Sequence, residues 1–178
     1  MLEWSLDALR AVQAVEQIVV ALPPGAGAPP GTIGVRGGAH RSQSVLAALR
    51  AGEGDPVIVH DAARPLVTAQ IFEAALAALA EHGCDAVIAA APVTDTIKEA
   101  AEGEVTRTLD RSTLWAVQTP QVFRRAALEH ALAAPPDVLT VATDEPGVVR
   151  IVASPAANMK ITTPGDLRVA ALALRERG

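Results

Sequence analysis

The sequence predicts an α/β fold, a doubly wound and mostly parallel sheet in a single domain that spans residues 1–178. Short runs of β-branched residues alternate with stretches of helical periodicity, which is typical of strands that alternate with helices. Half of the residues are hydrophobic, enough for one sizeable core. Because ligands of such sheets bind outside the carboxyl ends of the strands, the turns that follow strands are the candidate site.

The first half of the chain shows this alternation clearly. Its predicted elements are, in order, a helix at 2–12, strands at 17–22 and 32–35, a helix at 41–50, a strand at 56–60, and a helix that is capped by Thr68 and runs to Ala80. The loop at 23–31 contains Gly25 and Gly27 but also four prolines. Prolines lack the N–H groups that a phosphate-binding glycine turn needs, so this loop is not a dinucleotide fingerprint.

The second half keeps the alternation except between residues 92 and 119. The regular elements are a strand at 84–91, a helix at 124–133, a strand at 148–153 and a closing helix that starts at Pro164 after Thr163. Residues 92–119 instead contain short β segments around a turn at Gly103, which predicts a protruding β-hairpin arm at about residues 93–114. Exposed hairpin edges commonly need a partner chain to cover them, so we expect this arm to dimerise.

Composition excludes several classes of function. The chain carries 15 Lys+Arg against 20 Asp+Glu, a net charge of −5, and only 2% aromatic residues, so neither a basic surface nor a base-stacking platform for nucleic acid is expected. The longest apolar run, at 87–93, is too short to span a membrane. The single cysteine, Cys84, cannot form an internal disulfide, so we expect a core position for it and a cytoplasmic protein.

Charged and glycine-containing turns follow several predicted strands. The turns are Gly37-Gly38, residues 61–64, residues 143–145 and residues 158–160. A carboxylate, an arginine and a lysine gathered at one sheet edge suit phosphate chemistry. Asp61 is a candidate ligand for Mg²⁺ or for a substrate hydroxyl, whereas Arg64 either binds a phosphate or pairs with Asp61. The four histidines show no metal-ligand spacing with one another or with Cys84, so satisfied or surface roles are expected for the histidines.

Five ordered motifs carry a resemblance to a known family. They are 60–65 (HDAARP), 91–98 (APVTDTIK), 109–111 (LDR), 115–121 (WAVQTPQ) and 158–164 (NMKITTP). With these motifs, the sequence resembles the 2-C-methyl-D-erythritol 4-phosphate cytidylyltransferases from residue 2 to about residue 172. The ribitol 5-phosphate cytidylyltransferases share several of the motifs and are the alternative within the same class of enzyme.

The resemblance implies a fold, a reaction and an assembly. The fold is a Rossmann-like sheet of the nucleotidyltransferase type with a dimerisation arm. The reaction joins CTP and 2-C-methyl-D-erythritol 4-phosphate to give 4-diphosphocytidyl-2-C-methyl-D-erythritol and pyrophosphate, with Mg²⁺ or another divalent cation, in isoprenoid precursor biosynthesis. The assembly is a homodimer that acts on CTP and a sugar-alcohol phosphate.

The resemblance also implies roles for individual residues. The nucleotide-binding residues are Gly37, Gly38, Ser44, Asp61 and Ala62, the first three at the cytosine and Asp61 also at the metal. The residues of the acceptor pocket are Arg64, Thr96, Thr119 and Thr143. Arg111, which acts from the arm of the neighbouring subunit, and Lys160 hold the acceptor phosphate and aim its oxygen at the α-phosphorus of CTP. No protein nucleophile or general base is expected, and Asp144 and Glu145 are as well explained by capping or hydrogen bonding.

Two departures from the family pattern lead to further expectations. The family begins with a strand and a Gly-rich loop that wraps the CTP triphosphate, and no such segment precedes Met1 here. We therefore expect little or no activity from residues 1–178 alone, and unpaired edges on the strands at 17–22 and 56–60. A helix that follows Thr143 in the family is expected to be missing, because Pro146 and Gly147 come almost at once.

Three explanations of the shortened pattern remain open. The chain is a truncated gene sequence, part of a longer polypeptide, or a natural derivative that has lost catalysis. The first two are favoured, because a derivative without CTP binding has little reason to retain Arg111 and Lys160 together. From a different class of function, a non-catalytic nucleotide-binding or dimerisation module is the alternative.

Overall fold

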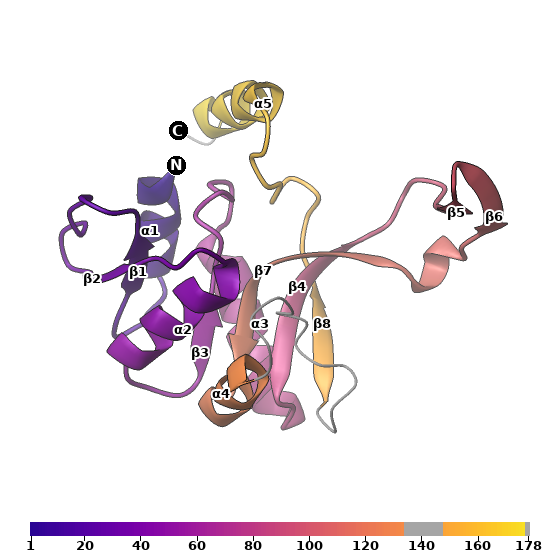
Figure 1. The fold of residues 1–178 in the computed structure, drawn as a ribbon. Coiled ribbons are helices and arrows are strands. Elements are labelled where there is room, and N and C mark those ends of the chain that lie inside the picture. Colours follow the sequence, from indigo (N-terminus) through magenta and orange to yellow (C-terminus); the bar gives the residue numbers. More distant parts are fainter. Residues whose placement is uncertain (134–147, 177–178) are drawn as a thin grey trace.

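The computed structural model describes residues 1–133 and 148–176, and its elements occur in the predicted order (Figure 1). The helices are α1 (Leu2–Arg10), α2 (Arg41–Ala51), α3 (Ala69–His82), α4 (Arg125–Ala133) and α5 (Pro164–Arg175), with a short 3₁₀ helix, η1 (Arg111–Thr113). The strands are β1 (Val19–Leu22), β2 (Ile33–Arg36), β3 (Val57–Val59), β4 (Ala86–Pro92), β5 (Lys98–Ala101), β6 (Glu104–Thr108), β7 (Trp115–Phe123) and β8 (Val149–Ala153). The predicted element boundaries are confirmed to within a few residues.

The central sheet has the strand order β3-β7-β4-β8. β4 and β8 are parallel, whereas β7 runs antiparallel to both β3 and β4. The chain leaves the carboxyl end of β4, forms the arm and returns directly as β7, and a direct return of this kind reverses the strand direction. The prediction of a mostly parallel sheet is confirmed, with β7 as its antiparallel member. Sequence reasoning had assigned the start of β7 to the hairpin and had not recognised a strand that continues to Phe123.

β1 and β2 form a separate parallel pair. Within the described part of the chain, β1 therefore pairs only with β2, and β3 pairs only with β7. The prediction that these two strands each have an unpaired edge is confirmed. α2 connects the two groups of strands, because it packs beside β1 and β2 while its Leu49 joins the core formed by Ala86 and Phe123 of the central sheet.

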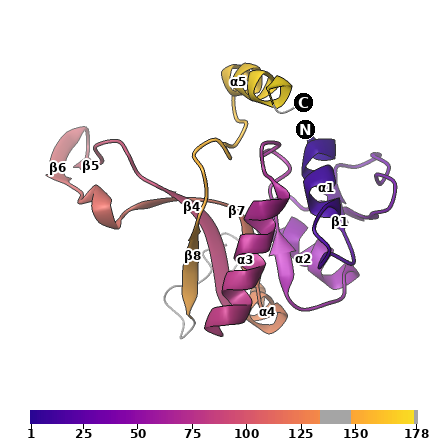
Figure 2. The ribbon, with the colours of Figure 1, turned by 180° about the vertical axis from the view of Figure 1, so that it is seen from behind.

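Helices cover both faces of the central sheet, as the doubly wound prediction requires (Figures 1 and 2). On one face, Ala75 and Leu79 of α3 pack against Val87 and Val122. On the other face, Leu128 of α4 packs with Leu49 of α2 against the sheet. Cys84 is 2% exposed and belongs to the core on the α3 side, as predicted. None of the helices in the described residues is both long and apolar enough to cross a lipid bilayer.

Two predicted helix termini have the expected local structure. Gly83 ends α3 in the left-handed region at φ 58°, where a residue without Cβ is not strained. Thr163 accepts a hydrogen bond from the backbone N–H of Asp166 at the start of α5, with Pro164 at its first turn. Thr68 is the residue before α3, as predicted, but its side chain makes no capping hydrogen bond.

The arm consists of β5, β6 and η1 and projects away from the body of the domain (Figure 1). It leaves after Pro92 and returns at Trp115, which agrees with the predicted arm at 93–114. Every residue of β5 and β6 is exposed, and Val105 is 62% exposed. The hairpin itself is confirmed, whereas its pairing with a second chain stays a prediction.

Candidate active site

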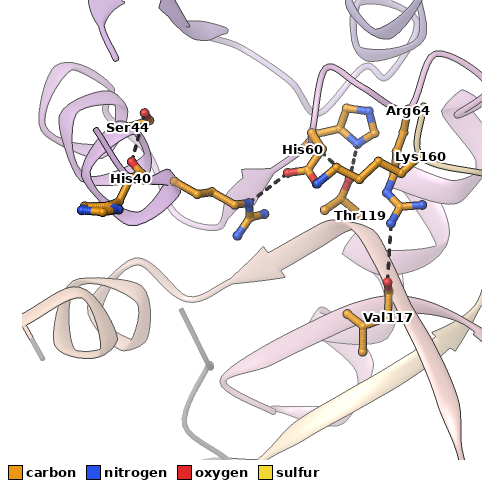
Figure 3. Close-up of polar contacts among 9 residues, drawn as sticks. His40, Ser44, His60, Arg64, Val117, Thr119 and Lys160 are labelled. Atoms are coloured by element: carbon orange, nitrogen blue, oxygen red, sulfur yellow. Dashed lines mark hydrogen bonds and ion pairs between the residues drawn. The ribbon is translucent and has the colours of Figure 1, made fainter. Parts of the chain in front are cut away.

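The predicted carboxylate lies between two cations at the carboxyl end of β3. One of these cations is Lys160, which is labelled in Figure 3 with His60 and Thr119 nearby. Asp61 accepts a hydrogen bond from Arg41 Nε at Oδ1 over 3.0 Å, and Lys160 Nζ lies 3.2 Å from its Oδ2. Arg41 is the first residue of α2, and Lys160 lies in the connection between β8 and α5. Three segments that are distant in the sequence therefore meet at this one carboxylate.

The charge of Asp61 is retained although the side chain is only 17% exposed. Burial raises the pKa of the Asp61 carboxyl, but the charges and hydrogen bonds of Arg41 and Lys160 outweigh that effect and hold the pKa below its ordinary value. Arg41 and Lys160 are more exposed, at 37% and 45% of their side chains. The cations are therefore available to an anionic ligand, while the carboxylate between them is held in place.

The backbone of Asp61 is positioned by Thr119 of β7. Thr119 Oγ1 accepts a hydrogen bond from the Asp61 N–H at 3.0 Å and lies 3.0 Å from His60 Nδ1. Burial lowers the pKa of His60 to about 4, so the ring is neutral at pH 7. The ring packs edge-on against Phe72, and its Nε2 is buried without a hydrogen-bond partner among the described residues.

A second buried network fixes the segment that carries Lys160. Arg64 is 9% exposed and donates to the backbone carbonyl of Asn158 at 2.7 Å and to that of Val117 at 3.5 Å. The amide of Asn158, which is fully buried, donates to the side chain of Gln118 and to the carbonyl of Thr119, both at 2.9 Å. Burial lowers the pKa of Arg64, whereas the charge of Asp61 raises it. The guanidinium stays charged at neutral pH, because the ordinary pKa of arginine is far above 7.

The turn between β2 and α2 is held by side chains of the helix that follows it. Ser44 Oγ accepts from the Gly38 N–H at 3.1 Å. Gln43 Oε1 accepts from the N–H groups of Ala39 and His40, at 2.8 and 3.3 Å. A Cβ on Gly38 would overlap the Cβ of Gln43, so this close approach requires glycine. Arg41 is the first residue of α2 and directly follows this loop. Its hydrogen bond to Asp61 therefore connects the loop to the end of β3.

Some predicted site residues lie away from this cluster. Arg111 and Thr96 are on the arm, both exposed, and Arg111 donates to the carbonyl of Thr94 at 2.6 Å. Figures 1 and 2 show that the arm points away from the body of its own chain. Thr143, Asp144 and Glu145 lie outside the described residues, as does the position of the helix that was expected to be missing.

The described residues contain no group of three or more His, Cys, Asp or Glu side chains that could hold a metal ion. Asp61 is the carboxylate available at this site, and cations contact both of its oxygens. This donor set suits Mg²⁺, which is commonly bound by one or two carboxylates together with substrate phosphates rather than by an all-protein cage. A metal that arrives with a phosphorylated ligand would take the place of Arg41 or Lys160 at an oxygen of Asp61.

The family model of 2-C-methyl-D-erythritol 4-phosphate cytidylyltransferase matches residues 1–176. The chain belongs to this family. A 2-C-methyl-D-erythritol 4-phosphate cytidylyltransferase of Symbiobacterium thermophilum is 45% identical over 152 residues, which are 80% of this chain and 64% of that protein. A bifunctional enzyme (IspD/IspF) of Anaeromyxobacter dehalogenans is 41% identical over 94% of this chain and 48% of its own length. This chain thus spans about half to two thirds of these two relatives.

A solved structure of a family member has the same fold. The crystal structure of 2-C-methyl-D-erythritol 4-phosphate cytidylyltransferase from Thermus thermophilus superimposes with a TM-score of 0.84 at 34% sequence identity. The match covers 98% of this chain and 88% of that one. The Rossmann-like fold expected from the resemblance is therefore confirmed.

Among the residues that the structure describes, those expected from the cytidylyltransferase family fall into three groups in space. Asp61, Arg64, Thr119 and Lys160 share one network, which the hydrogen bond from Ile161 N to Ala63 O at 2.8 Å closes, and Ala62 lies in the same turn between Asp61 and Ala63. Gly37, Gly38 and Ser44 form the neighbouring turn. The arm residues form the third group. Thr119 is 3% exposed and its hydroxyl is bonded within the protein, so in this state it positions Asp61 rather than facing a ligand.

Sequence reasoning did not select Arg41 and Gln43. Arg41 follows a glycine turn at a helix start, and a search for cations at helix starts beside strand ends would have found it. Gln43 stands at the capping-box position of α2, which is a sequence signal for a helix start, but its second bond, from the Ala39 N–H, depends on the path of the turn in space. Asn158 lay in a quoted motif but had been given no role, and its burial inside the protein is a tertiary property.

Proposed function

We propose that this chain is the nucleotidyl-transfer domain of an enzyme that joins CTP and 2-C-methyl-D-erythritol 4-phosphate. The observation that carries the proposal is the Asp61 carboxylate between Arg41 and Lys160, next to the 37–44 turn, in a chain of the cytidylyltransferase family. A carboxylate with flanking cations at the carboxyl ends of strands suits two anionic substrates that must approach each other.

The reaction needs little covalent chemistry from the protein. An oxygen of the acceptor phosphate forms a bond to the α-phosphorus of CTP, and the bond from that phosphorus to the oxygen bridging to the β-phosphate breaks, which releases pyrophosphate. The acceptor phosphate is already ionised at neutral pH, so no general base is required. The protein contributes by orienting the two anions and by screening their mutual repulsion.

Lys160 and Arg111 are assigned to the acceptor phosphate. Lys160 supports this role because its side chain is 45% exposed and its Nζ lies 3.2 Å from Oδ2 of Asp61. Arg111 is on an arm that points away from its own domain, which supports an action on the site of a neighbouring chain in a homodimer. Arg64, which is buried, is assigned to shaping the acceptor pocket together with Thr96, Thr119 and Thr143.

The nucleotide is assigned to the turn at Gly37, Gly38 and Ser44 and to Asp61 with Ala62. Asp61 would hold a divalent cation, most simply Mg²⁺, which would neutralise negative charge on the phosphates when bound. The single cysteine, which is buried, supports the expectation of a reducing, cytoplasmic location.

The test measures pyrophosphate release by the full-length gene product with CTP, Mg²⁺ and either 2-C-methyl-D-erythritol 4-phosphate or ribitol 5-phosphate. We expect turnover with the first acceptor. Lys160→Ala should lower kcat/KM for that acceptor by about 10²- to 10³-fold, as the loss of a preorganised charge commonly does. The matched control is Lys98→Ala, because this other lysine lies on the arm, bonded to Thr108, and should have little effect.

Three results would count against the proposal. Turnover only with ribitol 5-phosphate would favour the related activity, and wild-type kinetics of Lys160→Ala would remove Lys160 from the acceptor site. CTP binding without any turnover of the full-length protein would favour a non-catalytic nucleotide-binding module. The same assay on residues 1–178 alone tests the expectation of little activity, and a normal enzymatic rate would contradict it.

A further inference from the structure

The turn that precedes α2 directs its backbone N–H groups toward the helix, where Gln43 forms a capping box with His40. Three consecutive N–H groups, those of residues 38, 39 and 40, all donate to side chains of α2. The acceptors are Ser44 Oγ for the first and Gln43 Oε1 for the other two. The turn therefore presents its donors to its own helix and not to a ligand.

Peptide geometry determines where the carbonyl groups of this turn point. The cis peptide bonds of the described chain precede Pro56 and Pro120, so the bonds between residues 37 and 40 are trans. In a trans peptide, the C=O of one residue points opposite to the N–H of the next. The carbonyls of Gly37, Gly38 and Ala39 therefore point away from α2. Gly38 and Ala39 are exposed and Gly37 is partly exposed, so this side of the turn faces the outside of the domain.

From this geometry we infer that Gln43 determines which base the nucleotide site accepts, as a positioning residue that does not itself contact the base. The inference rests on the proposed function, which assigns the base to this turn. Cytosine carries an exocyclic amino group, a hydrogen-bond donor, where uracil carries an oxygen, an acceptor. A row of carbonyls matches the amino group of cytosine and repels the oxygen of uracil, so the turn selects CTP against UTP.

Gln43 is better suited to this role than Ser44. A hydroxyl can donate as well as accept, and it rotates to suit its partner. The Oε1 of Gln43 only accepts, and it receives two N–H groups at once, so it allows one orientation of the two peptides. The absence of a side chain on Gly38 lets Gln43 approach closely enough to do this.

The test compares two variants of Gln43 in the full-length protein. Gln43→Glu keeps an acceptor oxygen at the same place, and Gln43→Leu removes it at similar size. The matched control is Gln17→Leu, because Gln17 Oε1 likewise accepts a backbone N–H, that of Glu53 at 2.8 Å, at a site away from the turn. The dissociation constants of CTP and UTP are measured by calorimetry, and amide hydrogen exchange of Ala39 and His40 is followed by NMR.

We expect the preference for CTP over UTP to fall by about tenfold in Gln43→Leu, roughly the worth of one hydrogen bond, and to persist in Gln43→Glu and Gln17→Leu. Exchange at Ala39 should accelerate only in Gln43→Leu. A purely structural role of Gln43 would weaken the binding of CTP and of UTP equally. An unchanged ratio of the two dissociation constants in Gln43→Leu therefore overturns the inference. The proposed function stays intact in that case as long as the protein binds CTP.

The remaining outcomes are also decisive. An unaltered protein that binds CTP and UTP equally overturns the inference alone. An unaltered protein that binds no CTP overturns the proposed function and this inference with it. If Gln43→Leu fails to fold, Gln43→Ala takes its place, and fast exchange of the Ala39 amide in the unaltered protein would contradict the hydrogen bond on which the inference depends.

Discussion

Arg41 donates its Nε–H to Oδ1 of Asp61 at 3.0 Å and so links the turn before α2 to the end of β3. The two residues follow strands of different sheets in the described chain, since β2 precedes Arg41 and β3 precedes Asp61. The guanidinium thus connects the segment assigned to the base with the segment assigned to the metal and the acceptor. Lys160 contacts the second oxygen of the same carboxylate at 3.2 Å.

The ion pairs of Asp61 predict a pH-dependent contribution to stability. Because the pKa of Asp61 in the folded chain lies below its ordinary value, the pairs stabilise the fold above about pH 4 and lose this effect as the pH falls further. Asp61→Asn should lower the free energy of unfolding at pH 7 by about 1 kcal/mol, since the cations are partly exposed, and by less at pH 3. Urea unfolding at both pH values measures this. Asp7→Asn, in an exposed pair with Arg10, is the control. An equal loss of unfolding free energy at both pH values in Asp61→Asn would contradict the prediction.

The neutral, buried ring of His60 predicts a second pH dependence in a higher range. Burial lowers the pKa of His60 from 6.5 to about 4, so between these pH values the unfolded chain binds a proton that the folded chain does not. The free energy of unfolding therefore carries no penalty from His60 above pH 6.5, and it falls by up to about 3 kcal/mol as the pH drops toward 4.

Substitution separates His60 from the other titrating groups. His60→Asn keeps a polar atom near the position of Nδ1 and removes the titration, so its stability should change less between pH 7 and pH 4.5. His82→Asn, at the exposed end of α3, should behave like the unaltered chain. Urea unfolding across this range provides the measurement. Identical pH profiles for His60→Asn and the unaltered chain would show that His60 is not the group responsible.

Two neighbouring glycines predict opposite results for the same substitution. A Cβ at Gly37 would meet its nearest atoms at 3.4 Å, an ordinary contact distance, whereas a Cβ at Gly38 would overlap the Cβ of Gln43. Gly38→Ala should therefore displace the turn and weaken CTP binding by about tenfold or more, while Gly37→Ala should weaken it little. Calorimetric titration of both variants with CTP tests this, and equal affinities in the two would refute the packing argument.

The arm predicts a dimer that one surface charge disrupts. Val105 on β6 is 62% exposed on a hairpin whose outer edges have no neighbouring strand in the described chain. Sheet edges and apolar side chains of this kind are typical of association surfaces. Val105→Asp should shift the protein from dimer to monomer at micromolar concentration in sedimentation analysis. Leu172→Asp on α5, which is 61% exposed and outside the arm, is the control, and a monomeric unaltered protein would refute the prediction.

Sequence patterns predicted the elements well where one local rule decides them. The β-branched runs, the glycine after α3 and the Thr163-Pro164 start of α5 each act within a few residues, and each prediction was confirmed. β7 shows the limit of this reasoning. Its second half contains Pro120, which weakens the strand pattern, yet pairing with β3 and β4 on both sides makes it a central strand.

The sequence by itself determined the alternation of strands and helices, the arm, and the family to which the chain belongs, because these depend on local periodicity and on the order of motifs. Only the tertiary structure decided that Arg41 shares Asp61 with Lys160, that Gln43 orients the turn at Gly38, and that Thr119 is used inside the protein. These contacts join residues from different elements, and their formation depends on how strands and helices pack, which no pattern within one segment encodes.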